Sequence, residues 1–440
     1  MNPFFTSSLR SHPRGASVVR ILTAALQAVE PGQAVQHFAQ REGRQFIVAG
    51  RAYDLSAINH VRILGVGKAA RAMTAPLAVS LADASPRGLL IPKQAFAAPW
   101  NGFTVVPGGH PVPDTNSLKA GEDALQLARG LQADDLLICL LSGGGSALMT
   151  APLPGVTLAD FQMLTRALLA CGARIDEINT SRRHLDLLKG GGLARAAFPA
   201  QVISLILSDV VSNPLEAIAS GPTAPDPTTR ADALAVLKKY DLTASLPAAL
   251  LAALTSAAET PKPGDALFAR VQNLLVGSNF LAAHAALAQA SAEGFQPIFL
   301  GDDWQGEARQ VAQRLCQQLK NTRTNSPVCL VAGGETTVTL RGNGHGGRNQ
   351  ELALAAVNEL AGLENILLVA LASDGEDGPT DAAGAVVTGE TQKRAQAQHL
   401  SPDAFLERND AYSFFDALDD LLKPGPSGTN VNDLIFLFGF

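Results

Sequence analysis

Short apolar runs of four to seven residues alternate along this chain with longer stretches in which apolar and polar positions repeat at helical spacing. Buried parallel strands read as continuous apolar runs, and the amphipathic stretches between them predict crossover helices. Helices are predicted at 17–30, 117–131 and 158–169. The runs that predict strands are 60–64, 88–91, 103–106, 135–141, 201–207, 271–276, 297–300, 328–332, 366–370 and 435–438. The alternation indicates α/β architecture with a mainly parallel sheet.

Two proline-rich segments, 221–227 and 260–265, interrupt the middle of the chain, and the second is typical of a linker. Strand and helix patterns resume beyond it, so we expect two α/β domains, at 15–258 and 266–440. In open parallel sheets, ligands bind at the edge formed by the carboxyl ends of the strands. The loops that follow the predicted strands are therefore the candidate sites.

Composition narrows the class of protein. Apolar residues make up 47% of the 440 residues and aromatic residues only 5%, which suits helices packed on a parallel sheet. A formal charge of −6 disfavours electrostatic binding to nucleic acid. The four cysteines are widely spaced and match no zinc pattern, so we expect reduced thiols and a cytoplasmic protein. No apolar run approaches the roughly 18 residues of a membrane span. We therefore expect small-molecule partners, no nucleic acid or membrane, and a monomer or homodimer.

The first glycine loop, 65–70, follows the first predicted strand and matches G-x-G-x-x-A, the pattern of a dinucleotide site. That site also needs an acidic residue at the end of the next strand, whereas Pro92 and Lys93 follow strand 88–91. Lys68 favours a different use, because an ammonium at the start of a helix beside bare amides binds anions. The alternative is a solvated lysine in the first helical turn.

A second glycine loop directly follows strand 135–141 and consists of Ser142, Gly143, Gly144, Gly145 and Ser146. Three glycines and two hydroxyls at a strand end leave backbone N–H groups exposed to a phosphate. The loop is not a Walker A motif, because G-x-x-x-x-G-K-[ST] occurs nowhere in the chain. A tight turn between strand and helix, without a ligand, is the alternative.

A late glycine-rich stretch, 333–347, contains Glu335 and precedes Arg348 and Asn349 at the start of a predicted helix. A guanidinium offers a planar fork of donors for carboxylate or phosphate, and the start of a helix adds partial positive charge. The stretch therefore predicts an anion-binding loop. A glycine-rich turn with a surface arginine is the alternative.

Asp209 and Asp374 each follow an apolar strand, which places a carboxylate at the ligand edge of the sheet. Such carboxylates bind Mg²⁺ or orient a nucleophilic hydroxyl. An Asx turn or a helix cap is the alternative for each. Asp377 and Asp381 are close to Asp374 in sequence, and an acidic cluster of this kind needs a metal or Arg348 nearby.

The segment 179–192 reads as a capped helix that ends at glycines. Its cations Arg182, Arg183 and Lys189 are either ligand contacts or a solvated face. His184 in the same segment is more typical of a structural or surface histidine than of a base.

The polar loop 425–434 precedes the last predicted strand and carries Thr429 and Asn430. Their hydroxyl and amide groups either contact hydroxyls of a substrate or belong to a plain loop.

Together these motifs resemble the glycerate 2-kinases whose C-terminal half is called the MOFRL domain, a family also named hydroxypyruvate reductases. The resemblance covers nearly the whole chain. The stretches that carry it are 65–70, 141–147, 188–192, 208–210, 220–223, 333–337, 346–351, 373–375 and 428–433. The resemblance implies a larger Rossmann-like N-terminal domain, a smaller MOFRL-type C-terminal domain, and an active site in the cleft between them.

The resemblance also implies transfer of the γ-phosphoryl group of ATP to the 2-hydroxyl of D-glycerate, with Mg²⁺, to give 2-phosphoglycerate. Such transfer needs cations on the phosphoryl group and a carboxylate near the attacking hydroxyl. Lys68, Arg348 and Asp209 are expected to be catalytic, and Asp209 and Asp374 to bind the metal. The residues expected to bind substrate or phosphate are Ser142, Gly143, Gly144, Gly145, Ser146, Lys189, Thr223, Glu335, Asn349, Thr429 and Asn430.

Two other classes of protein stay open at this point. A reductase of hydroxypyruvate that uses NADH or NADPH is favoured by the G-x-G-x-x-A pattern and disfavoured by the missing acid after strand 88–91. A noncatalytic nucleotide or molybdopterin-type cofactor binder would not need several carboxylates at strand ends.

Overall fold

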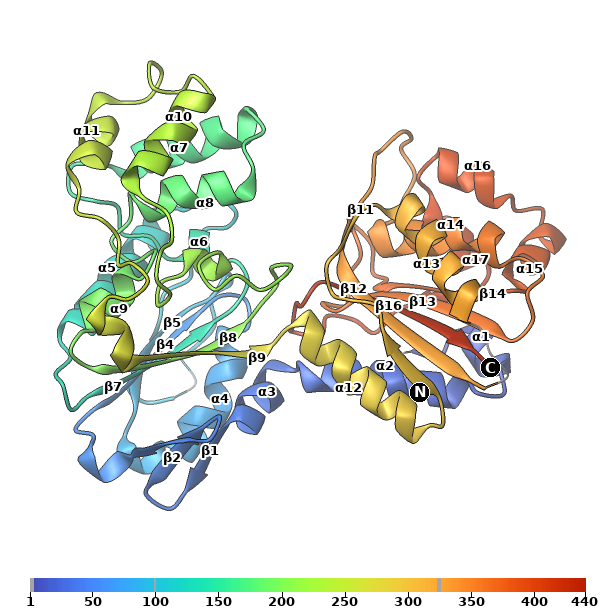
Figure 1. The fold of residues 1–440 in the computed structure, drawn as a ribbon, viewed down its shortest axis with the longest axis horizontal. Helices are drawn as coiled ribbons and strands as arrows, with labels where there is room; N and C mark the ends of the chain where they lie inside the picture. Colours follow the sequence, from blue (N-terminus) through green and yellow to red (C-terminus); the bar gives the residue numbers. More distant parts are fainter. Residues whose placement is uncertain (1–3, 99, 323–325) are drawn as a thin grey trace. The chain divides into compact units, whose positions relative to one another are not determined.

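The computed structural model in Figure 1 describes residues 4–98, 100–322 and 326–440. The chain divides into two compact units. Pro31–Val276 form the first, which we call the parallel-sheet unit. Met1–Glu30 and Gly277–Phe440 form the second, the mixed-sheet unit. Within the described ranges, no helix combines the length and the apolar character that a membrane span requires.

The parallel-sheet unit is built on a six-stranded sheet with the order β6-β5-β4-β7-β8-β9. The pairs β4–β5, β4–β7, β5–β6 and β7–β8 are all parallel. The strands are β4 (Val61–Val66), β5 (Arg87–Ile91), β6 (Phe103–Val105), β7 (Leu136–Leu141), β8 (Gln201–Leu207) and β9 (Val271–Gly277). Each matches a predicted apolar run, and the mainly parallel sheet is confirmed.

Helices cover both faces of this sheet, because alternate residues of its strands point to opposite sides. Leu64 and Leu137 belong to an apolar core shared with helices α5 (Thr115–Arg129) and α9 (Gly192–Ala197). Helix α4 (Ala70–Ser80) packs on β4 and β7 from the other side (Figure 1). With both faces covered, the edge at the carboxyl ends of the strands is where loops can bind a ligand.

Four further helices form a layer with its own core, in which Phe161, Leu164, Leu237 and Leu250 are buried. They gather at one end of the unit (Figure 1). These helices are α7 (Leu158–Ala170), α8 (Ile175–Arg183), α10 (Arg230–Lys239) and α11 (Ala248–Ser256).

The predicted bounds of the capped helix at 179–192 are wrong. Helix α8 begins four residues earlier, where the Glu177 carboxylate accepts the N–H of Arg174, and it ends at Arg183. The chain then turns, because the carboxylate of Asp186 accepts the N–H of Leu188 at 2.9 Å. The glycines expected to end the helix instead precede α9.

A small antiparallel sheet completes this unit. It consists of β1 (Ala39–Glu42), β2 (Gln45–Val48) and β3 (Arg51–Asp54), which follow helix α3 (Pro31–Phe38). The strands are short and rich in polar residues, so a search for apolar runs does not reveal them.

The mixed-sheet unit has the strand order β10-β12-β16-β13-β14-β15, and β11 also pairs with β12. Strand β16 (Asp433–Gly439), near the end of the chain, lies between β12 (Val328–Thr337) and β13 (Ile366–Ala372) and is antiparallel to both. This central antiparallel strand makes the sheet mixed. The other strands are β10 (Gln296–Phe299), β11 (Trp304–Glu307), β14 (Gly384–Thr388) and β15 (Leu421–Leu422).

Helices again cover both faces. Val328 and Leu330 of β12 share a core with helices of one face, which are α13 (Ala308–Thr322), α14 (Arg348–Leu360) and α17 (Ala411–Ala417). Helices α12 (Asn279–Ala292) and α2 (Gly15–Ala28) lie side by side on the other face (Figure 1). The mixed-sheet unit also contains α1 (Ser7–Ser11), α15 (Thr391–Ala397) and α16 (Pro402–Glu407), and the short α6 (Gly145–Leu148) belongs to the parallel-sheet unit.

The predicted opening helix is α2, and it packs within the mixed-sheet unit although it begins the chain. Ile21 and Leu22 are fully buried, and Arg20 Nε lies 2.6 Å from Glu293 Oε1 at the end of α12. The predicted domain ranges instead group this helix with residues up to 258. An amphipathic pattern shows that a helix needs an apolar partner, but it does not show which partner.

Replacing Leu22 by Ala tests this packing. Removal of a fully buried leucine side chain leaves a cavity, so we expect the free energy of unfolding to fall by about 2–5 kcal/mol. Gln27→Ala, at an exposed position of the same helix, should change it by less than about 0.5 kcal/mol. Urea unfolding followed by circular dichroism measures both. Equal losses in the two variants would contradict the packing of α2.

Candidate active site

The first glycine loop and the second lie against each other, because they follow the adjacent parallel strands β4 and β7. The N–H of Lys68 donates to the carbonyl of Gly143 at 3.2 Å, and the N–H of Ala69 donates to Ser142 Oγ at 3.1 Å. The N–H of Ser142 in turn donates to the carbonyl of Val66 at 2.9 Å. We call the two loops together with Asp209 the Lys68 site.

Two glycines permit this close approach. Gly67 has φ +114°, and a Cβ at this position would overlap the hydroxyl and carbonyl oxygens of Ser142. A Cβ at Gly143 would overlap the carboxylate of Asp209, which follows β8. The structure therefore brings together Lys68, the Ser142 loop and Asp209, as the sequence predicts for neighbouring strand ends.

The second glycine loop presents backbone donors. The N–H groups of Gly143, Gly144, Gly145 and Ser146 have no acceptor among the hydrogen bonds of the described residues. Buried N–H groups are almost always paired, with protein, water or a ligand. Lys68 is exposed at the start of α4, and its ammonium makes no hydrogen bond or ion pair within the described part of the chain. Four amides and one ammonium are thus available to an anion.

His110 also belongs to this site, although the sequence analysis does not single it out. A Cβ at Gly144 would lie 3.2 Å from His110 Cδ2, so the imidazole borders the loop. Burial, followed by the charges of Lys68 and Lys93, lowers the pKa of His110. The ring is therefore neutral at neutral pH. The only signal in the sequence is the pair of glycines that precedes His110.

A strained turn closes one side of the loop. Ala219 and Ser220 have positive φ values of 51° and 60°, which cost free energy for residues other than glycine. A Cβ at Gly145 would lie 2.7 Å from Ala219 Cβ, and the hydroxyls of Ser146 and Ser220 are 2.8 Å apart. The Ser146 hydroxyl, predicted to bind substrate or phosphate, is therefore held by the protein.

Two predicted phosphate contacts have structural positions instead. Lys189 is fully buried, and its ammonium donates to Asp186 Oδ2 at 2.6 Å and to the carbonyl of Met149 at 3.0 Å. Thr223 is also buried. Its hydroxyl accepts a hydrogen bond from the Ser204 hydroxyl at 2.8 Å and donates one to Asn273 Oδ1 at 2.8 Å. A sequence pattern of glycines and polar residues does not show whether a polar side chain contacts a ligand or another residue in the core.

The solvated face considered for Arg182, Arg183 and Lys189 is wrong, because all three side chains are buried. Arg183 Nε lies 3.0 Å from Asp226 Oδ1. His184 Nε2 lies 3.3 Å from Asp226 Oδ2, so His184 is structural, as expected.

The second candidate site surrounds Arg348, which begins helix α14 as predicted. Its Nε and Nη2 lie 2.6 and 3.1 Å from the two carboxylate oxygens of Asp433, and its Nη1 lies 2.7 Å from Glu335 Oε1. We call these three residues with Asn349 the Arg348 site. Asp433 was not among the predicted site residues, although it lies within 428–433, one of the stretches that carry the resemblance.

The strand register explains this arrangement and corrects one prediction. Residues 333–337 were expected in a loop, but they continue strand β12. Gly334 pairs with Asp433 across the antiparallel β12–β16 pair, so Glu335 lies next to Asp433. The glycine-rich loop proper is confined to the residues that follow β12 and lead to Arg348.

The charge of Arg348 is balanced by its neighbours. Burial disfavours the charged guanidinium, but Asp433 and Glu335 outweigh that effect and raise the pKa of Arg348. Burial raises the pKa of Asp433 to about 6, and Arg348 opposes this rise. Asn349 Nδ2 donates to Asp433 Oδ1 at 2.9 Å, so this predicted substrate contact also holds Asp433 in place.

The acidic residues near this site act mainly as helix and turn caps. Asp377 accepts the N–H groups of Asn349 and Gln350 at 3.2 and 2.8 Å, and its charge acts on Arg348. Asp374 Oδ1 accepts the N–H of Glu376 at 3.2 Å, which is the Asx turn considered as its alternative. Among the described residues, no group of three or more His, Cys, Asp or Glu side chains is arranged for a metal. The metal role of Asp209 and Asp374 stays a prediction.

The last polar loop packs on this site. The Thr429 hydroxyl is buried without a hydrogen-bond partner in the described residues, and Asn430 Oδ1 accepts the N–H of Asn432 at 3.0 Å. Asn279, the first residue of α12, donates to the carbonyls of Val431 and Asp433 at 2.9 and 2.7 Å. Asn279 therefore fixes the start of β16, and no motif in the sequence points to it.

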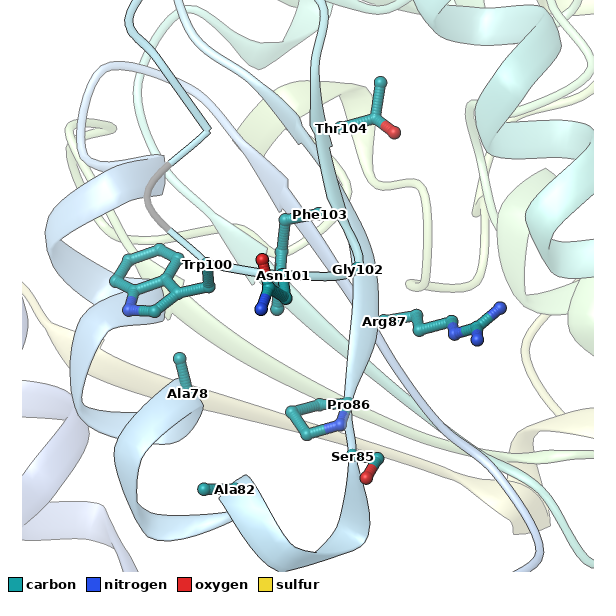
Figure 2. A pocket seen from close by; sticks show the side chains of 10 residues that line it. All are labelled: Ala78, Ala82, Ser85, Pro86, Arg87, Trp100, Asn101, Gly102, Phe103 and Thr104. Atoms are coloured by element: carbon teal, nitrogen blue, oxygen red, sulfur yellow. The ribbon is translucent and has the colours of Figure 1, made fainter.

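One cavity adjoins the Arg348 site, and another lies apart from both candidate sites. One of about 660 Å³ is lined by Gly346, Gly347, Arg348, Asp374 and Asp377 in the mixed-sheet unit. Another of about 610 Å³ lies at the amino ends of β5 and β6, beside Trp100 and Pro86 (Figure 2). None of the predicted site residues lines this second cavity.

Comparison with known proteins gives consistent matches. Residues 17–255 match a family model described as a domain of unknown function, DUF4147, and residues 328–433 match the MOFRL family. A D-glycerate 2-kinase from Thermotoga maritima is 38% identical, with 95% of this chain and 96% of that protein aligned. A protein from Agrobacterium vitis that bears the name hydroxypyruvate reductase is 40% identical over 84% of this chain and 85% of its own length.

The fold of this chain also matches a solved structure of a glycerate kinase. The crystal structure of a glycerate kinase from Thermotoga maritima matches with a TM-score of 0.87 and 37% sequence identity. The match covers 97% of this chain and 99% of that chain.

Gly67→Ala tests the close approach of the two glycine loops. Gly155→Ala is the matched control, because Gly155 also has positive φ, +85°, but no atom within 4 Å of a Cβ. Both variants lose the freedom of glycine, and only Gly67→Ala also overlaps Ser142. We expect its free energy of unfolding to fall by about 1–3 kcal/mol more than that of the control. Chemical denaturation measures the difference, and equal losses would contradict the packing.

Proposed function

Because this chain belongs to the glycerate kinase family, we propose that it transfers the γ-phosphoryl group of ATP to the 2-hydroxyl of D-glycerate. The products would be 2-phosphoglycerate and ADP. The observation that carries the proposal is the Lys68 site, where the N–H groups of residues 143–146 have no acceptor among the described residues and the exposed Lys68 lies next to them in the adjoining loop. The alignment of nearly the whole chain with a D-glycerate 2-kinase supports the choice of substrate and position.

The Lys68 site has the groups that phosphoryl transfer requires. Such reactions need little covalent chemistry from the protein, and depend on positioning and on stabilising negative charge. The unpaired amides and Lys68 fit the phosphate oxygens of ATP. Asp209 lies against Gly143 in the same site, so its carboxylate fits either a Mg²⁺ ligand or the acceptor for the substrate hydroxyl proton. Bound Mg²⁺ would supply charge neutralisation on the phosphate oxygens.

Arg348 is proposed as a second charge stabiliser. The Arg348 guanidinium pairs with the buried Asp433 on one side and with Glu335 on the other. The Glu335 side chain is 44% exposed. An incoming phosphate or carboxylate oxygen would compete with Glu335 rather than with Asp433, because the exposed contact is the weaker one. Thr429 and Asn430 stay proposed substrate contacts.

The reductase alternative is favoured by the name of one relative. It also needs an acidic residue after β5 to bind the cofactor ribose, and Lys93 follows that strand. The positive charge of Lys93 lowers the pKa of His110, which borders the second glycine loop. Positive charge at this end of the sheet attracts anions. The kinase is therefore the better reading. We also propose a cytoplasmic location, since all four cysteines are free thiols.

One pair of assays tests the function. The purified protein is incubated with D-glycerate, ATP and Mg²⁺, and in parallel with hydroxypyruvate and NADH or NADPH. We expect ADP to form only when D-glycerate is present, and to stop when EDTA removes the metal. Oxidation of the nicotinamide cofactor without ADP formation would contradict the proposal.

Lys68→Met and Arg348→Lys test the two cations. Loss of one preorganised charge stabiliser lowers kcat by about 10²- to 10³-fold, and we expect this for Lys68→Met. Its melting temperature should stay unchanged, because the Lys68 side chain has no partner within the described residues. Arg348→Lys keeps the charge but loses the fork on Asp433, so both kcat and melting temperature should fall.

Lys119→Met is the control for these variants. The Lys119 side chain on α5 is 61% exposed, and among the described residues it pairs with Asp123 alone. It should retain the turnover of the wild type. Turnover of Lys68→Met equal to that of the control would remove Lys68 from the mechanism.

A further inference from the structure

Arg182 on helix α8 is a buried charge that has no partner in the part of the chain the structure describes. The residue is only 8% exposed, and no described residue forms a hydrogen bond with its Nε. Within the described residues its guanidinium makes no hydrogen bond and no ion pair. Burial lowers the pKa of Arg182, and the charge of Asp186 opposes this only in part. An unpaired buried charge is strongly unfavourable, so its presence calls for a partner that is not part of the fold.

The two cations nearest to Arg182 in sequence are both paired with buried aspartates. Arg183 pairs with Asp226, and Lys189 pairs with Asp186. Asp186 makes no hydrogen bond or ion pair with Arg182 among the described residues; its Oδ2 accepts from Lys189, Thr150 Oγ1 and the N–H of Ala151. Its Oδ1 accepts a further N–H, from Leu188. Asp186 is therefore held by Lys189 and by groups of the backbone and Thr150, and within the described residues Arg182 has no carboxylate at bonding distance.

Contacts on two sides place Arg182 beside the second glycine loop. Asn179, one helical turn before Arg182, accepts from the Ser220 hydroxyl at 3.3 Å, and Ser220 lies 2.8 Å from Ser146. On the other side, the Lys189 ammonium donates to the carbonyl of Met149, the residue that follows α6. The turn of α8 that carries Arg182 is thus linked to Ser146 through Ser220, and the chain that follows α8 contacts Met149 through Lys189.

We propose that Arg182 binds the carboxylate of the hydroxy-acid substrate. This inference rests on the proposed function, since it assigns the acidic end of D-glycerate to the Lys68 site. A guanidinium binds a carboxylate through two parallel hydrogen bonds, and a planar carboxylate supplies the missing negative charge. The phosphate chain of ATP has other donors, namely Lys68 and the amides of residues 143–146. Assigning the carboxylate to Arg182 leaves those amides to the phosphate.

A contact between Arg182 and the carboxylate would select for acidic substrates. The substrate is a 2-hydroxy acid in which the carboxylate is attached to the carbon that carries the reacting hydroxyl. Fixing the carboxylate on Arg182 therefore fixes that hydroxyl near the second glycine loop. Glycerol has the same hydroxyls but no carboxylate, so it should bind weakly to the wild type and gain nothing from Arg182.

The experiment measures binding of D-glycerate and of glycerol by calorimetry, without ATP, to the wild type, Arg182→Met, Arg182→Lys and Arg174→Met. We expect Arg182→Met to bind D-glycerate about 10- to 100-fold more weakly, the value of a charge-assisted hydrogen bond. Arg182→Lys should lie between it and the wild type, because it keeps the charge without the fork. Arg174, whose side chain is 75% exposed at the start of the same helix, is the control and should bind like the wild type.

Thermal melting of the unliganded proteins separates binding from structure. Removal of an unpaired buried charge should leave the melting temperature of Arg182→Met equal to or above that of the wild type. A clearly lower melting temperature with unchanged affinity for D-glycerate would make Arg182 a structural residue and overturn the inference. Unchanged affinity and KM in Arg182→Met, with wild-type phosphoryl transfer intact, would overturn this inference and leave the proposed function standing. Absence of phosphoryl transfer in the wild type would instead refute the function itself.

Discussion

The close approach of two loops at the carboxyl ends of β4 and β7 is the constraint on which the candidate site depends. The backbone of Gly67 lies against Ser142, and the N–H of Lys68 donates a hydrogen bond to the carbonyl of Gly143. These bonds use the donors of the first loop and leave those of the second, 143–146, without an acceptor in the described residues. The glycine pattern at 65–70 therefore supports its neighbour, and the N–H groups that remain without an acceptor in the described residues belong to the second loop.

The two candidate sites differ in their balance of charge. In the parallel-sheet unit, Lys68 and Arg182 carry positive charge without a carboxylate partner among the described residues. In the mixed-sheet unit, Arg348 is already paired with Asp433 and Glu335. The first arrangement attracts an anion directly, since no existing pair has to break. The second holds a guanidinium in one orientation and exchanges an exposed carboxylate for a ligand.

Sequence reasoning found the parts of the fold whose pattern is local. Continuous apolar runs revealed the parallel sheet, and glycines after strands revealed the Lys68 site. The predictions that failed depend on contacts between distant residues. Pairing with Asp433 turns 333–337 into a strand, and the partners of Arg183 and Lys189 lie in the core rather than in water. Arg182 differs from them because no described residue pairs with it, and the sequence does not reveal that difference.

Phosphorus NMR of the products tests the central claim most directly, because it reports both the transfer and the position of the phosphate. The wild-type protein would be incubated with D-glycerate, ATP and Mg²⁺, and authentic 2-phosphoglycerate and 3-phosphoglycerate added afterwards to identify the new resonance. We predict a phosphate monoester that coincides with 2-phosphoglycerate, together with ADP. A spectrum with 3-phosphoglycerate, or with only inorganic phosphate and ADP, would contradict the assignment.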